Sequence, residues 1–122
     1  MSGETQVFDL AVVASLVGDD PAMIREIVVA YLGELPGMLA QVESAQAGRA
    51  AERVTFHAHS IKGVAANLGA ARTREAAAEL EAAGRAGDLE RCAALAPRLR
   101  DELAALTREL RRRYPADGRE AG

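Results

Sequence analysis

Two long segments of this chain repeat an apolar residue every three or four positions, which is the spacing of one face of an α-helix. The repeating residues of the first segment are Ile24, Val28, Tyr31, Leu35, Met38 and Val42. Those of the second segment are Cys92, Ala96, Leu99, Leu103, Leu106 and Leu110. Because such helices are stable only when their apolar faces pack together, the pattern predicts an all-α protein.

Glycine, proline and aspartate mark the ends of five expected helices. These helices cover about 9–17, 21–47, 49–67 and 70–83, with a fifth that follows Asp88 as its N-cap. Gly84 is expected to be a left-handed C-cap. Pro36 is expected to kink or interrupt its helix, and Pro97 is expected to bend the last one. Short connections make neighbouring helices antiparallel, which predicts an up-down antiparallel four-helix bundle with an additional short N-terminal helix.

The chain length of 122 residues corresponds to one domain, expected to span 1–122 with its core at about 8–113 and a flexible tail at 115–122. No apolar run is long enough to cross a membrane, and no signal peptide opens the chain. The single cysteine, Cys92, falls on an apolar stripe, which favours core packing and a reducing, cytoplasmic location.

A net charge of −3 argues against nucleic acid as the main partner. The basic cluster at Arg108–Arg113 is the exception, but it falls at the expected end of a helix, where the helix dipole favours cations.

The segment from Ala58 to Ala70 places one histidine on the outside of a predicted helix. At about 100° of rotation per residue, His59 lies well away from the core face. That face consists of Val54, Ala58, Ile61, Ala65 and Leu68. An exposed imidazole can attack through one ring nitrogen while the other holds the proton, so His59 is the candidate nucleophile.

Three neighbours of His59 favour a phosphoryl site and a docking face. Lys62 lies one turn away, so its ammonium can reach a phosphoryl group and balance its charge. Gly63 costs about 1 kcal/mol of helix stability relative to alanine, and close approach of a partner would offset that cost. Phe56 is an outward-facing aromatic in a chain that is only 3% aromatic, which favours a binding surface. The alternative interpretation, from the pattern alone, is a plain helical surface.

His57 is expected at the edge of the core stripe, partly buried, and is not the predicted acceptor. Residues two apart on a helix point in nearly opposite directions, so His57 and His59 cannot bind one metal ion together. No third ligand lies near them in the sequence, and no metal site is expected.

The string from His59 to Gly69 resembles the signature of the histidine phosphotransfer (HPt) domain family. The matching residues are His59, Ile61, Lys62, Gly63, Ala65, Ala66 and Gly69. The resemblance extends to Phe8-Asp9, Asp20-Pro21, Leu80-Glu81 and Gly87-Asp88-Leu89. Val64 and Ile61 depart from the commoner residues of the family, and both are expected to face the bundle. The third helix also lacks the acidic residue that is common at its start, so its N-cap is expected to be weak.

This resemblance implies a phosphorelay protein in which His59 accepts a phosphoryl group from one receiver-domain aspartate and gives it to another. Lys62 would stabilise the phosphoryl charge, and the partner would bind Phe56, Gly63, Ala66 and Asn67. The implied partners are response regulator receiver domains and a hybrid histidine kinase. The resemblance implies no cofactor, with Mg²⁺ only in the receiver, and no autonomous kinase activity; a monomer is expected.

Two alternatives share this fold. The chain could be the phosphorylatable domain of a larger hybrid or chemotaxis-type histidine kinase, although a start at Met1 favours a stand-alone protein. It could also be a non-catalytic helical adaptor, although such adaptors usually lack the acceptor histidine.

Overall fold

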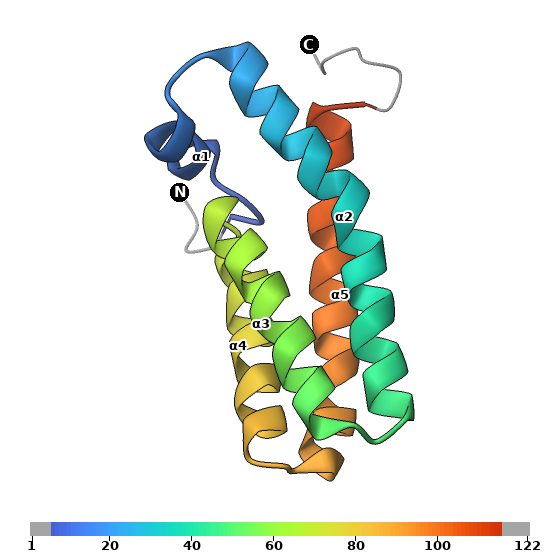
Figure 1. Ribbon diagram of the computed structural model, residues 1–122. Helices are drawn as coiled ribbons and strands as arrows, with labels where there is room; N and C mark the ends of the chain where they lie inside the picture. Colours follow the sequence, from blue (N-terminus) through green and yellow to red (C-terminus); the bar gives the residue numbers. More distant parts are fainter. Residues whose placement is uncertain (1–5, 116–122) are drawn as a thin grey trace.

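The computed structural model describes residues 6–115, and the regular structure of this part of the chain is entirely helical (Figure 1). The helices are α1 (Leu10–Val17), α2 (Pro21–Ala47), α3 (Ala51–Asn67), α4 (Ala71–Arg85) and α5 (Leu89–Arg113). The prediction of an all-α protein with five helices is therefore confirmed. Apart from Pro115, the tail predicted to be flexible lies outside the described residues.

The four longer helices lie side by side (Figure 1). Each of them packs against its neighbours in the chain, and α5 also packs against α2. The connections at 48–50, 68–70 and 86–88 are short, and each leads the chain into a helix that packs against the preceding one. Helix α1 lies at one end of the molecule, where it contacts α2 and α3 (Figure 1).

The core is aliphatic, as the low aromatic content requires. The fully buried side chains from the two predicted stripes are Val28, Val42, Cys92, Leu99, Leu106 and Leu110. Ile61 is fully buried and Val64 is also in the core, which confirms that both departures from the family pattern face the bundle. Burial raises the pKa of the Cys92 thiol, with a further contribution from Asp88, so this cysteine is a packing residue.

Aspartates begin three of the helices. Asp9, Asp20 and Asp88 each accept a hydrogen bond from a backbone N–H in the first turn of α1, α2 and α5, which satisfies a donor that has no partner within the helix. Helix α3 begins after Ala50 without a side-chain cap, as expected from its sequence. It also begins two residues later than predicted, because Arg49 adopts a left-handed conformation with φ of +54°.

The prediction for Gly84 is wrong, and of the two outcomes predicted for Pro36, a kink or an interruption, the structure excludes the interruption. Gly84 is not a C-cap, because α4 continues to Arg85 and the left-handed residue is Gly87, with φ of +72°. Neither Pro36 nor Pro97 interrupts its helix, since α2 and α5 each continue through the proline. Packing along the whole length of these helices outweighs the backbone hydrogen bond that each proline removes.

The segment before α1 is fixed at the corner between α3 and α4. The backbone N–H of Asp9 donates to the carbonyl of Leu68 at 3.0 Å. Gly69 has φ of +64°, and a Cβ at this position would lie 2.8 Å from both the Cβ and the carbonyl oxygen of Asp9. The corner therefore requires glycine both for its backbone conformation and for the approach of Asp9.

Candidate functional site

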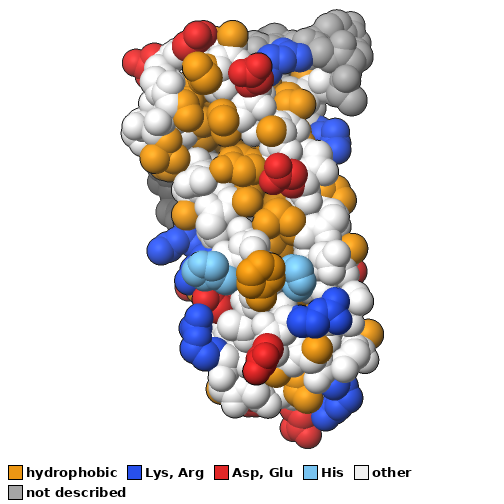
Figure 2. Space-filling model, viewed as in Figure 1, with side chains coloured by type: hydrophobic (Ala, Val, Ile, Leu, Met, Phe, Trp, Pro, Cys, Tyr) orange, Lys and Arg blue, Asp and Glu red, His pale blue; other side chains and the backbone are white. Residues whose placement is uncertain are grey.

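The outward face of α3 carries the residues that the sequence singled out. The side chain of His59 is 65% exposed, and Phe56 is 66% exposed. Gly63 and Ala66 are also exposed, and a Cβ at Gly63 would meet no atom within 4 Å. Figure 2 shows the two histidines on one face of the molecule, with basic side chains close to each of them and apolar side chains nearby. The predicted orientation of this helix is therefore correct.

A carboxylate from α4, which the sequence analysis did not identify as a site residue, lies behind His59. Glu81 accepts a hydrogen bond from His59 Nδ1 at 2.8 Å, and its second oxygen lies 2.7 Å from Lys62 Nζ. Arg85 Nη2 donates to the same oxygen as His59, at 2.7 Å. These four side chains are called the Glu81 cluster below. They bring together two residues of α3 and two of α4.

Glu81 is ionised although its side chain is only 3% exposed. Burial alone would raise its pKa, but hydrogen bonds from Lys62, Arg85 and His59 lower the pKa to about 2. A buried carboxylate is stable only when its oxygens accept several hydrogen bonds or face cations. Both conditions are met here, so Glu81 carries a negative charge at neutral pH.

The charge of Glu81 determines which nitrogen of His59 carries the proton. An ionised carboxylate can only accept hydrogen bonds, so His59 Nδ1 must be the donor in this contact. In the neutral ring, Nε2 then keeps its lone pair. Since Nδ1 faces the buried carboxylate and most of the side chain is exposed, Nε2 is the nitrogen available to an incoming group.

The cluster also carries an excess of positive charge. Lys62 and Arg85 contribute two cations against the single carboxylate of Glu81. The side chain of Lys62 is partly exposed and that of Arg85 mostly exposed, so both can turn toward a group that binds at His59. An anion at Nε2 would therefore meet two cations that the protein already holds nearby.

The side chains of Asn67 and His57 each contact a neighbouring residue. Asn67 is exposed, but its side-chain N–H donates to the hydroxyl of Tyr31 on α2 at 2.8 Å. His57 is partly exposed, as expected, and does not belong to the Glu81 cluster. Its ring lies edge-on to that of Phe56, with centroids 5.1 Å apart. His57 therefore supports the aromatic side chain that stands out from this face.

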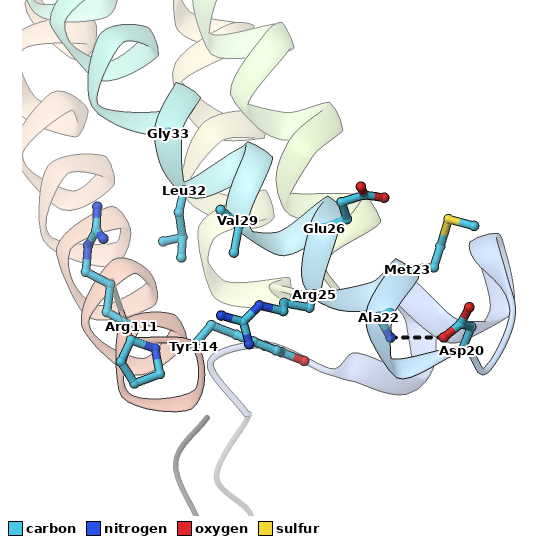
Figure 3. A pocket seen from close by; sticks show the side chains of 11 residues that line it. Asp20, Ala22, Met23, Arg25, Glu26, Val29, Leu32, Gly33, Arg111 and Tyr114 are labelled. Atoms are coloured by element: carbon cyan, nitrogen blue, oxygen red, sulfur yellow. Dashed lines mark hydrogen bonds between the residues drawn. The ribbon is translucent and has the colours of Figure 1, made fainter. Parts of the chain in front are cut away.

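A hollow of about 710 Å³ lies elsewhere, between the start of α2 and the end of α5 (Figure 3). Its lining includes Met23, Arg25, Val29, Arg111 and Tyr114, and none of its residues belongs to the Glu81 cluster. The candidate chemistry therefore lies on an exposed surface rather than in this hollow. A surface is the geometry needed by a nucleophile that must reach a group held in another protein.

Residues 6–115 hold neither a metal cluster nor a membrane span. No group of three or more His, Cys, Asp or Glu side chains in this range could hold a metal ion. No helix in the same range is long and apolar enough to span a bilayer.

Comparison with known proteins agrees with this geometry. Residues 26–109 match the family model of the Hpt domain. The structure is similar to the crystal structure of histidine-containing phosphotransfer protein B (HptB) from Pseudomonas aeruginosa PAO1, with a TM-score of 0.80 and 25% sequence identity. The similarity covers 88% of this chain and 94% of that protein. No curated protein matches the sequence significantly.

Proposed function

This chain belongs to the Hpt domain family, and we propose that it relays a phosphoryl group between receiver-domain aspartates through Nε2 of His59. The observation that carries the proposal is the contact between His59 Nδ1 and the buried carboxylate of Glu81, 2.8 Å long. This contact holds the proton on the inner nitrogen and leaves the outer nitrogen free to attack.

The proposed transfer needs no proton to move. The Nε2 lone pair attacks the phosphorus of an aspartyl phosphate, the bond between phosphorus and the aspartate oxygen breaks, and the aspartate leaves as a carboxylate. The ring keeps its Nδ1 proton and becomes a positively charged imidazolium, which the Glu81 carboxylate stabilises. In the second step a receiver aspartate attacks the phosphorus, and the lone pair returns to Nε2.

Lys62 and Arg85 are proposed to stabilise the phosphoryl oxygens during both steps. Phosphoryl transfer is catalysed mainly by positioning and by cations near the transferred group. Both side chains already lie within 2.7 Å of Glu81, next to His59 on the same cluster. Lys62 was predicted for this role from the sequence, and Arg85 is added because it shares the Glu81 oxygen that accepts from His59.

The receiver domain is proposed to dock on the outward face of α3, over Phe56, Gly63, Ala66 and Asn67. Exposed Phe56 offers apolar contact area, and the open space at Gly63 lets a partner approach the helix backbone. Asn67 would contribute from a position already held by Tyr31. Figure 2 shows further apolar side chains on the same face, which would extend the contact.

Several finer features belong to the same proposal. We infer an up-down antiparallel bundle of α2 to α5 with α1 added at its end, and a monomer that works in the cytoplasm with a hybrid histidine kinase and response regulators. The chain itself is proposed to need no cofactor or metal and to have no kinase activity of its own. Mg²⁺ is expected only in the partner receiver.

The acceptor is tested by replacing each histidine in turn. His59→Gln is expected to abolish labelling by a phosphorylated receiver domain, because no other exposed imidazole belongs to the cluster. His57→Gln serves as the matched control and should retain most of the labelling. The modified group should be stable to base and labile to acid, as phosphorus–nitrogen bonds are. Labelling that persists in the His59 variant would show that His59 is not the phosphoacceptor.

A further inference from the structure

Helix α4 approaches α3 closely at one buried residue, Gly84. A Cβ at this position would collide with the hydroxyl of Thr55 and would lie 3.0 Å from the Thr55 backbone nitrogen and 3.1 Å from the Ala51 carbonyl oxygen. Two of these atoms belong to the backbone of α3, so rotation of a side chain alone cannot relieve the contact. The absence of a side chain at Gly84 therefore sets how near the two helices can lie.

The contact at Gly84 lies one helical turn from the Glu81 cluster. Glu81 precedes Gly84 by three residues in α4, and His59 follows Thr55 by four residues in α3. Residues at these separations occupy the same face of a helix. Gly84 therefore meets Thr55 on the same pair of faces on which Glu81 meets His59.

We propose that Gly84 is a positioning residue for the phosphoacceptor, because it sets the separation of α3 and α4 at which Glu81 holds the Nδ1 proton of His59. The effect of Gly84 on the proton of His59 stands by itself. Its effect on phosphotransfer rests on the proposed function. Gly84 touches neither the reacting atoms nor the partner, and it acts through Glu81.

A single methyl group at Gly84 is enough to disturb this arrangement. Thr55 cannot turn away freely, because its hydroxyl donates to the carbonyl of Ala51 at 2.9 Å. The helices must therefore move apart by several tenths of an ångström or more. The hydrogen bond from His59 to Glu81 is 2.8 Å long, and hydrogen bonds of this kind weaken beyond about 3.2 Å. Arg85 lies on the same helix as Glu81 and moves with it, and Lys62 has a long flexible side chain that can follow Glu81, whereas the short imidazole of His59 cannot.

The test compares Gly84→Ala with Gly37→Ala. A Cβ at exposed Gly37 in α2 meets no atom within 4 Å, so the control adds the same methyl group to a helix without a contact. The ¹⁵N chemical shifts of the His59 ring report which nitrogen carries the proton. The wild type and Gly37→Ala should both show the Nδ1–H form. Gly84→Ala should show a mixture of the two neutral forms, and its phosphotransfer rate should fall about tenfold, as for a weakened hydrogen bond to a charged group.

A second variant covers the case in which Gly84→Ala does not fold. Adding Thr55→Ala removes the colliding hydroxyl but leaves the two backbone contacts at 3.0 and 3.1 Å, so the double variant should fold and show a smaller shift of the proton. A wild-type ring form in either folded variant overturns the proposal, even if the melting temperature falls. Failure of both variants to fold assigns Gly84 to folding alone and also overturns it.

The ring measurement needs no phosphate, so it separates this proposal from the proposed function. If the wild type shows the Nδ1–H form but no receiver labels it, the proposed function fails while the positioning role of Gly84 stands.

Discussion

Two charged clusters on α4 have opposite compositions. In the Glu81 cluster, one carboxylate that is 3% exposed faces two cations and a histidine. In the second, which we call the Arg98 cluster, Arg98 of α5 lies 2.8 Å from Glu79 and 3.1 Å from Glu75. Arg98 is 39% exposed, and solvent reaches all three of its members.

The difference indicates which cluster is built for a ligand. The Arg98 cluster has more negative than positive charge, lies in solvent and joins α4 to α5. Exposed ion pairs of this kind contribute little to stability. The Glu81 cluster has spare positive charge around a buried acid, an arrangement that carries a desolvation cost and does not serve packing alone. That excess is what a phosphoryl group on His59 would neutralise.

A second carboxylate beside His59 tests whether the two clusters differ in function because of their charge. Gly63→Glu adds one on the outward face one turn from the acceptor, which cancels the excess positive charge of the Glu81 cluster. We expect loss of phosphotransfer through steric hindrance and repulsion. The fold should survive, because nothing lies within 4 Å of the new Cβ and glutamate is a better helix former than glycine.

Transfer assays and circular dichroism test this variant together. Gly37→Glu is the matched control, since that position is also open and lies on α2 away from the cluster. Normal transfer by Gly63→Glu, or an unfolded spectrum, would show that this face is not where the receiver docks.

Removing the buried charge itself should weaken the fold in a pH-dependent way. The pKa of Glu81 is lowered from 4.5 to about 2, so its ionised form stabilises the folded state above about pH 4.5. This contribution, of about 3 kcal/mol, is lost as the pH falls from about 4.5 toward 2. Glu81→Gln should therefore be less stable than the wild type at pH 7, with a difference that shrinks over that range.

Urea denaturation at several pH values measures this effect. Glu79→Gln, which alters the Arg98 cluster instead, should leave the pH dependence of the wild type nearly unchanged. If the free energy of unfolding of Glu81→Gln stays below that of the wild type by a constant amount down to pH 2, the assigned ionisation of Glu81 is contradicted.

Lys62 tests whether the spare positive charge acts on the phosphoryl group. Lys62→Ala leaves Arg85 to neutralise Glu81, so the bundle should remain folded. Loss of one charge-assisted contact corresponds to roughly 1.5–3 kcal/mol, or about tenfold to a hundredfold in the transfer rate. Single-turnover transfer from a phosphorylated receiver gives this rate. A rate equal to that of the wild type would limit Lys62 to the neutralisation of Glu81.

The smallest effect is expected on the other side of the comparison. Arg98→Ala removes two solvent-exposed ion pairs and should cost less than about 1 kcal/mol in the free energy of unfolding. Phosphotransfer should not change, because no residue of the Arg98 cluster belongs to the Glu81 cluster around His59. A transfer defect in this variant would show that the two clusters are coupled through α4.

The sequence was sufficient for the parts of the site that lie on one helix. Helical rotation alone placed His59, Phe56 and Gly63 on the outward face of α3, because the spacing of the apolar residues fixes which face is buried. The helix starts at Asp20 and Asp88 could be predicted for the same reason, since each aspartate accepts from a backbone N–H no more than three residues away.

The contributions of α4 could not be predicted in the same way. Whether Glu81 faces His59 depends on the register and rotation of α4 against α3, which no single helix determines. One signal was present: Glu81 lies among apolar residues that form the buried face of α4, next to Leu80 and near Ala77 and Gly84. An acid in such a position is buried, and a buried acid requires partners.

Gly84 was misassigned for a related reason. A glycine near the end of a predicted helix is typical of a left-handed C-cap, and Gly87 three residues later fits the same description. Only the neighbouring helix distinguishes the two, because Gly84 is required by contact with Thr55 and Gly87 by its backbone conformation.

The bond between Asp9 and Leu68 sets an order for the assembly of the chain. It joins residues almost 60 positions apart, so the loop that it closes is entropically costly until the intervening helices have formed. Helix α1 has only eight residues, too few to be stable alone in water. The contact of Asp9 with Leu68 and Gly69 can form only after the corner between α3 and α4 has formed. We therefore expect α1 to fold after the helices on which it packs and to open before them, in fluctuations that leave the histidine-bearing hairpin of α3 and α4 intact.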